Sequence, residues 1–139
     1  MTTAPNRPAS VVNGVALLAA AAGIVIQVLA GVPGFPVVPP GPIILGAAGI
    51  AVLVVRRRWA AVVGVAAPLF ILVGGLVEGS GFDRLADPGT VWPFAGTASQ
   101  AAGVLVGLGA GIVALVRKPS GVRSPSGAAA STSGRGRRG

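Results

Sequence analysis

Apolar residues gather into long stretches along the chain, separated by short polar or Pro/Gly-rich joints. Three stretches carry no charge and hold 20, 19 and 22 residues: Val11 to Ala30, Trp59 to Val77 and Ala95 to Val116. A helix rises ~1.5 Å per residue, so each is long enough to cross a hydrocarbon core of about 30 Å. Because lipid supplies no hydrogen-bond partner for the backbone, unbroken runs of this kind predict membrane-spanning helices.

A fourth stretch is shorter, with 13 strictly apolar residues at positions 43–55. Three prolines between 39 and 42 suit a first helical turn, where a missing N–H matters little. At the other end, the arginines at 56–58 can snorkel toward the membrane surface. We therefore predict a spanning helix from about 39 to 58.

The joints between these stretches are rich in turn-forming residues. Residues 31–42, GVPGFPVVPPGP, predict a short, stiff connection. The longest internal loop is 78–94, in which the segment 87–90, DPGT, signals a turn. Within this loop, Ser80 and Asp83 have the spacing of a capping box, which predicts one short turn of helix on the membrane surface.

The predicted fold is an all-α integral membrane four-helix bundle made of two tandem helical hairpins. We expect a cytoplasmic N-terminus over 1–10, the four-span domain over 11–118, and a disordered basic cytoplasmic tail over 119–139, which is rich in Ser, Gly, Ala and Arg. GIAVLVVRR (49–57) is similar to GIVALVRK (111–118), as two hairpins of one orientation would be after a duplication. A chain this rich in Gly, Ala and Val also produces such matches by chance, and both explanations stay open.

The charges predict the orientation in the membrane. Ten of the eleven basic residues fall before the first helix, between the second and third, or after the fourth, which an even number of spans places on one side. The positive-inside rule makes that side the cytoplasm, with both termini there. The remaining base, Arg84, shares the opposite loop with all three acids. Five basic residues at helix ends mark the cytoplasmic boundary and are candidates to contact lipid headgroups: Arg56, Arg57, Arg58, Arg117 and Lys118.

The first helix has a second interpretation. Arg7, an apolar core and the ending Val28-Leu29-Ala30 are also typical of a cleaved secretory signal peptide. The uncharged stretch exceeds the usual core of ~7–15 residues, which favours a retained span. The Lys-poor, Ala/Gly/Val/Arg-rich composition resembles that of high-GC bacteria, so we expect a bacterial cytoplasmic membrane.

Composition narrows the chemistry. Hydrophobic residues make up 53% and charged residues 10% of the chain, against roughly 45–50% and about 25% in soluble proteins. There is no cysteine and no histidine, so the chain lacks disulfides and the usual ligands of zinc. No ionisable side chain lies deep within a predicted span, although proton-coupled transport generally depends on one. We therefore expect no enzyme activity, no catalytic residue, no cofactor and no metal site.

Glycines form a stripe on the fourth predicted span. Gly103, Gly107 and Gly111 are four residues apart, and such a flat face lets another helix approach closely in lipid. A complementary small-residue face on the first span would consist of Ala16, Ala20 and Gly23. The stripe predicts packing within the bundle, with a dimer interface as the alternative.

Few polar residues lie within the spans. Gln27 and Gln100 are predicted at similar depth near the outer surface, with Thr97 and Glu78 close to that depth. These four side chains are candidates for a small polar vestibule that opens outward. The alternative is ordinary hydrogen bonding between helices, worth ~0.6 kcal/mol on average.

Pro68 lies in the middle of the third span. It cannot donate the hydrogen bond that the carbonyl of Gly64 would otherwise accept, so we expect a bend there. The bend would serve either as a hinge or as a static kink.

These features predict a small non-enzymatic membrane protein. The primary hypothesis is a scaffold or accessory subunit that packs through its small-residue helix faces against a membrane-protein partner or a second copy. The alternative is a small channel, pore-former or uncoupled carrier. Membrane lipids are the expected surroundings, and we predict no nucleic-acid partner because the positive charge follows helix ends.

Overall fold

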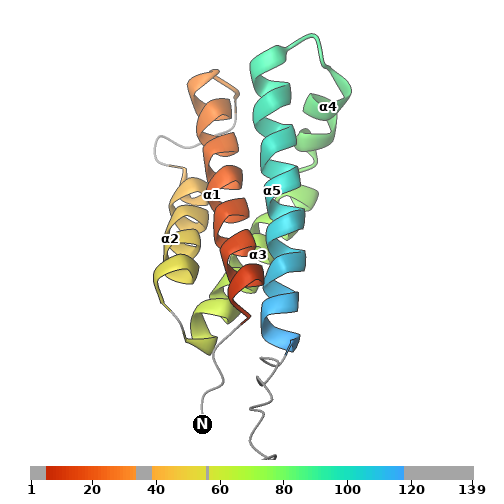
Figure 1. Ribbon diagram of the computed structural model, residues 1–139. Coiled ribbons are helices and arrows are strands. Elements are labelled where there is room, and N and C mark those ends of the chain that lie inside the picture. The colour runs from red at the N-terminus through yellow and green to blue at the C-terminus, as the bar shows by residue number, and fades with distance from the viewer. Residues whose placement is uncertain (1–5, 34–38, 56, 118–139) are drawn as a thin grey trace, which may run out of the picture.

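The computed structural model describes residues 6–33, 39–55 and 57–117. Predictions for residues 1–5, for Arg56 and Lys118, and for the tail at 119–139 lie outside these ranges. The described part contains five helices in the order α1 (Arg7–Leu29), α2 (Pro40–Val54), α3 (Arg58–Glu78), α4 (Ser80–Ala86) and α5 (Val91–Val116) (Figure 1). The all-α prediction is confirmed.

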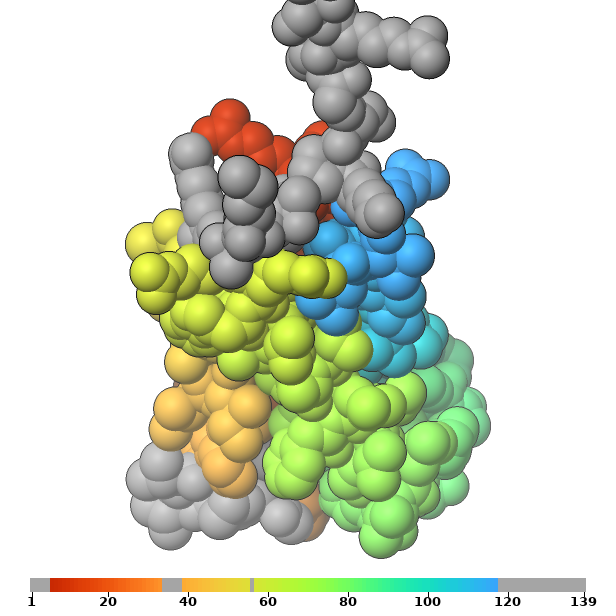
Figure 2. Space-filling model, turned by 90° about the horizontal axis from the view of Figure 1, so that it is seen from below, coloured from red at the N-terminus to blue at the C-terminus, as the bar shows by residue number. Residues whose placement is uncertain are grey.

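Four of the helices form a ring, and the fifth, α4, packs beside α5 and α3 near one end of the bundle. α1 packs most extensively against α5 and next against α2, while α3 joins α2 to α5 and so closes the ring. Neighbours in the ring run in opposite directions, so that α1 begins and α5 ends at the same end of the bundle (Figure 1). Figure 2 shows α3 running over the bundle between α2 and α5, with α4 following beside α5.

Three of the described helices, α1, α3 and α5, are long and apolar enough to cross a membrane, which indicates a membrane location. The helix predicted for 39–58 is shorter: α2 ends at Val54, and its 15 residues rise only ~22 Å. The prediction that it continues to 58 is wrong because the chain must reverse before α3 begins at Arg58. Val55 and Arg57 take up extended backbone angles to make that reversal.

Two helices begin earlier than the apolar pattern predicted. α1 starts at Arg7 instead of 11, and α5 starts at Val91 instead of 95. In both cases a proline, Pro8 or Pro93, lies in the first turn. Proline is tolerated there because the first N–H groups of a helix have no partner within it.

Small residues allow α1 and α5 to approach each other closely. A Cβ atom added to Gly103 would lie 2.6 Å from the carbonyl oxygen of Ala16 and 2.8 Å from the backbone nitrogen of Ala20. Farther along, a Cβ atom on Gly23 would lie 2.6 Å from the carbonyl oxygen of Gly96. No side chain fits at these crossings without moving backbone, so this contact requires glycine on both helices.

The fully buried residues of α3 all lie in its first half. Its buried residues run from Ala60 to Pro68, and no residue beyond Pro68 is buried. Beyond Pro68, Ile71 and Leu72 are partly buried against the core, and the last six residues of the helix are exposed.

Asn13 of α1 supplies the partner that the backbone of α3 lacks. Its Nδ2 donates to the carbonyl oxygen of Gly64 at 2.9 Å and also to that of Gly107 on α5. Gly64 is four residues before Pro68, so its carbonyl is the one that proline leaves without an intrahelical donor. A buried side chain of α1 thus fastens α3 and α5 at one point. Its other amide atom, Oδ1, has no hydrogen-bond partner.

Charge separates toward the two ends of the bundle. The described basic residues Arg7, Arg57, Arg58 and Arg117 lie where α1 and α3 begin and where α5 ends. The acids and Arg84 lie at the opposite end, around α4. The two tryptophans mark both ends, since Trp59 is in the first turn of α3 and Trp92 in that of α5, and both are exposed.

Candidate functional site: a pocket between α3, α4 and α5

A pocket of about 580 Å³ opens beside the part of α3 beyond Pro68. Its walls come mainly from α3, α4 and α5, with Ile24 of α1 and the start of α2 completing them. Most of the lining is apolar, and the polar side chains gather at the end nearest α4. They are Glu78, Arg84, Thr97 and Gln100.

The sequence of α3 explains why this space is empty. Ile71, Gly74, Gly75 and Glu78 recur at three- and four-residue intervals, so they share one face of the helix. All four line the pocket. A Cβ atom added to either glycine would meet nothing within 4 Å. The two glycines therefore leave room where larger side chains would fill the space beside α5.

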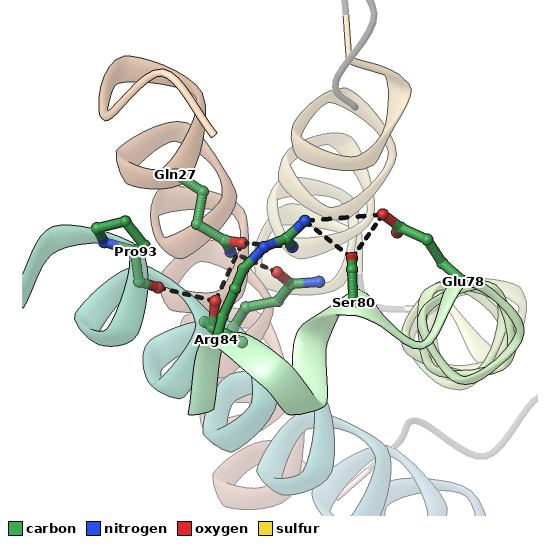
Figure 3. A network of polar contacts seen from close by, with 7 residues as sticks. Gln27, Glu78, Ser80, Arg84 and Pro93 are labelled. Atoms are coloured by element: carbon green, nitrogen blue, oxygen red, sulfur yellow. Dashed lines mark hydrogen bonds and ion pairs between the residues drawn. The ribbon is translucent and has the colours of Figure 1, made fainter. Parts of the chain in front are cut away.

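The floor of the polar end is a set of hydrogen bonds between α1 and α5 (Figure 3). The fully buried Gln27 donates from Nε2 to Oε1 of Gln100 at 2.7 Å. Its own Oε1 accepts from the hydroxyl of Thr97 at 3.1 Å. That hydroxyl also lies 2.8 Å from the carbonyl oxygen of Pro93, within α5. These bonds satisfy polar groups that would otherwise be costly to bury.

Arg84 of α4 reaches over this floor and connects it to α3. Its Nη1 donates to Oε1 of Gln27 at 3.3 Å, and its Nη2 donates to Oγ of Ser80 at 2.8 Å. The Ser80 hydroxyl in turn donates to Oε1 of Glu78 at 2.7 Å, while Arg84 Nη2 is 3.8 Å from the same oxygen. Figure 3 shows these side chains converging from three helices.

Gly79 sets the direction in which α4 leaves α3. It has a left-handed φ of 77° and caps the end of α3, a conformation for which glycine is strongly preferred. The predicted capping box is wrong, because Gly79 and not Ser80 occupies the N-cap position and makes no side-chain cap bond. As the first residue of α4, Ser80 instead points its hydroxyl toward Glu78 and Arg84, which lies four residues along the helix.

The structure brings the four predicted vestibule residues into one network. Gln27 bonds directly to both Thr97 and Gln100, and Glu78 is connected to Gln27 through Ser80 and Arg84. Ser80 and Arg84 were not among the residues predicted for this site. Arg84 nevertheless carried a signal, because it is the single base in a loop that holds all the acids.

The glycine stripe of α5 lies inside the bundle. Added Cβ atoms on Gly103 and Gly107 would meet α1, and one on Gly111 would meet Val65 of α3 and Asn13. This face is therefore occupied within the chain. The predicted headgroup residues Arg57, Arg58 and Arg117 are exposed at the end of the bundle opposite the pocket, and Arg56 and Lys118 lie outside the described residues.

The pocket offers binding groups of both signs. The guanidinium of Arg84 is largely shielded, with 17% of its side chain exposed, whereas 60% of the Glu78 side chain is exposed. Across residues 6–33, 39–55 and 57–117, no cluster of three or more acidic side chains is placed to hold a metal ion.

Comparison of the chain with protein-family models, curated proteins and solved structures finds no match.

Proposed function

We propose that this chain is a non-enzymatic multi-pass protein of the cytoplasmic membrane that binds an amphiphilic molecule from the bilayer. The observation that carries the proposal is the pocket, which is apolar along α3 and α5 and polar at one end only. Ligand sites between helices of a bundle combine mostly apolar walls with a few placed polar groups, in volumes of roughly 300–1,000 Å³. The volume of about 580 Å³ falls within that range.

The length of the pocket supports a ligand that lies parallel to the helices. Its lining on α3 extends over nine residues from Phe70 to Glu78, a helix rise of ~12 Å. Half of a hydrocarbon core of about 30 Å is ~15 Å. With Glu78 at the membrane surface, the apolar part of the pocket would extend over most of one leaflet. The tail of an amphiphile would lie along it, with its head at the polar end.

This geometry favours a binding protein or uncoupled carrier over a pore. Between Asn13 and Gln27, the inward face of α1 consists of apolar residues that are at most 8% exposed: Ala16, Leu17, Ala20, Ala21 and Ile24. The two polar clusters are therefore separated by a packed apolar core. A continuous water path along α1 would require that core to open.

A scaffold or accessory subunit is the second candidate. The observation that favours it is the side of α3 beyond Pro68 that does not line the pocket, where Val73 and Val77 are exposed. A membrane-protein partner, or a second copy, would pack on this apolar side of α3. It would not use the α5 glycine stripe, which α1 already covers. Co-purification in mild detergent tests the idea, and an unchanged set of co-purifying proteins after Val73→Asn would contradict it.

In our proposal α2 is a fourth, short crossing, so that both termini are cytoplasmic. The exposed arginines at the ends of α1, α3 and α5 support this orientation through the positive-inside rule. The acidic end with the pocket then faces the outer leaflet.

A matched pair of glycine substitutions tests ligand binding. Gly75 lines the pocket and Gly109 does not, yet an added Cβ atom meets nothing within 4 Å at either position. Gly75→Leu should fill the pocket, while Gly109→Leu should project into the surroundings of α5. We expect purified full-length protein to retain a single-chain lysophospholipid in native mass spectrometry, and Gly75→Leu alone to lose it. Equal retention by both variants would refute the pocket as the binding site.

A further inference from the structure

We infer that the ligand is a zwitterionic phospholipid of the surrounding leaflet, with its phosphate on Arg84, its ammonium group on Glu78 and one acyl chain between α3 and α5. This inference rests on the proposed binding function and adds the headgroup chemistry. It follows from the charges at the polar end of the pocket and from their spacing.

Two charged side chains of opposite sign line the pocket, Arg84 and Glu78. They are 3.8 Å apart at their closest nitrogen and oxygen atoms. A charge-assisted hydrogen bond between such groups is ordinarily ~2.7–2.9 Å, so this pair is loosely associated. A headgroup that carries both a phosphate and an ammonium group can replace the loose Arg84–Glu78 pair by two closer ion pairs, phosphate with Arg84 and ammonium with Glu78. Each protein charge would then keep a partner of opposite sign.

The exposed fractions of the two side chains suit these roles. Arg84 is held between the floor and α4 by its bonds to Gln27 and Ser80, so its planar guanidinium is already positioned to contact two oxygens of a phosphate group. Glu78 is the last residue of α3 and its side chain is mostly exposed. It can turn toward an ammonium group at the outer edge of the headgroup without losing a buried contact.

The charge balance of this end favours a zwitterion over an anion. Glu78, Asp83 and Asp87 outnumber Arg84 here, so the described residues of this end sum to −2. An anionic headgroup would be attracted by the Arg84 guanidinium, but the three nearby carboxylates would repel it. A zwitterionic headgroup has no net charge to be repelled, and its ammonium group gains from the acids.

α4 provides the surroundings that a lipid headgroup requires. Phe82 and Leu85 line the pocket and are exposed, while Arg84 on the same short helix joins the polar network. A helix with apolar side chains toward the acyl chains and charged ones toward the headgroups is typical of the membrane interface. The pocket mouth therefore combines an apolar rim with a pair of charges.

The test is a competition between two lysophospholipids with the same acyl chain. Full-length protein in mild detergent is mixed with equal amounts of lysophosphatidylethanolamine and lysophosphatidylglycerol, and bound lipid is identified by native mass spectrometry. We expect the zwitterionic lipid to be preferred by roughly tenfold, the effect of about one hydrogen bond to a charged group. Glu78→Gln should abolish or reverse this preference. Arg84→Gln should weaken retention of both lipids by a similar factor.

Asp83→Asn is the matched control for Glu78→Gln. It removes one negative charge from the same end of the bundle at an exposed residue that does not line the pocket. The control should keep the preference of the parent protein, and circular dichroism should show unchanged helix content in each variant. An equal or opposite preference in the parent protein, or the same change in both acid variants, would overturn the headgroup assignment while leaving the binding function intact. Retention of neither lipid by the parent protein would overturn both.

Discussion

The contact between Asn13 and the backbone of α3 leads to a sharp stability prediction. Pro68 lacks the N–H that would bond the carbonyl of Gly64, and Asn13 Nδ2 donates to that carbonyl at 2.9 Å. Replacing Pro68 with alanine restores the backbone donor. We therefore expect Asn13→Ala to destabilise the parent protein more than it destabilises the Pro68→Ala variant.

The expected loss of stability in Asn13→Ala depends on which carbonyl oxygen is left without a hydrogen-bond donor. In Asn13→Ala, the carbonyl of Gly107 keeps the intrahelical partner available in the middle of α5, but that of Gly64 has none. A buried acceptor without a partner costs about 1–3 kcal/mol, and interhelical hydrogen bonds in membranes contribute ~0.6 kcal/mol on average with a maximum near ~1.7. We expect Asn13→Ala to cost about 1–3 kcal/mol, and the coupling with Pro68→Ala to be about 1 kcal/mol.

Unfolding by SDS titrated into mild-detergent micelles, followed by circular dichroism, gives the four free energies of a double-mutant cycle. The free-energy cost of the space left by the Asn13 side chain is the same in the parent protein and in the Pro68→Ala variant. It therefore cancels in the coupling free energy. Changes that add within about 0.3–0.5 kcal/mol, the usual limit for independent sites, would show that the two residues do not share the Gly64 carbonyl.

Three further predictions concern packing, topology and the polar floor. Gly103→Leu should lower stability by about 1–3 kcal/mol or more in the same assay, because its side chain would press on the backbone of α1; a cost no greater than that of Gly109→Leu would contradict the close crossing. Reporter fusions at Gly89 and Gly139 should report opposite sides of the membrane, and the same side for both would refute the proposed four crossings. Gln100→Leu removes the acceptor of the 2.7 Å bond from Gln27 and should cost about 0.6–1.7 kcal/mol; no measurable loss would mean that the floor does not depend on this bond.

The long helices could be predicted from the sequence because length and hydropathy are local properties. The boundaries were less accurate where a proline occupied the first turn, as Pro8 and Pro93 do, since proline usually signals a loop. The end of α2 was also misplaced. Arginine side chains can prolong a helix toward the surface, but the position of the reversal before α3 depends on how the neighbouring helices pack.

The site required contacts between distant parts of the chain. The sequence put Gln27, Thr97 and Gln100 at one depth, and helix geometry was enough for that. It also showed that Pro68 frees a carbonyl, but the donor lies 51 residues before Gly64. The role of Arg84 depends on the left-handed Gly79 and on the direction of α4, which no periodic pattern encodes.

The pairing of α1 with α5 has a consequence for biosynthesis. Of the described helices, α1 leaves the ribosome first and α5 last, yet they form the most extensive contact in the bundle. Helices of a membrane protein insert before they associate. Under the proposed topology, α1 therefore enters the bilayer before α5 is made, and Asn13 and Gln27 then lack their α5 partners. The early hairpin of α1 and α2 is then an assembly intermediate. A nascent chain that ends before α5 would lack Gly107, Thr97 and Gln100, the α5 partners of Asn13 and Gln27, so both amides would make fewer hydrogen bonds than in the complete bundle.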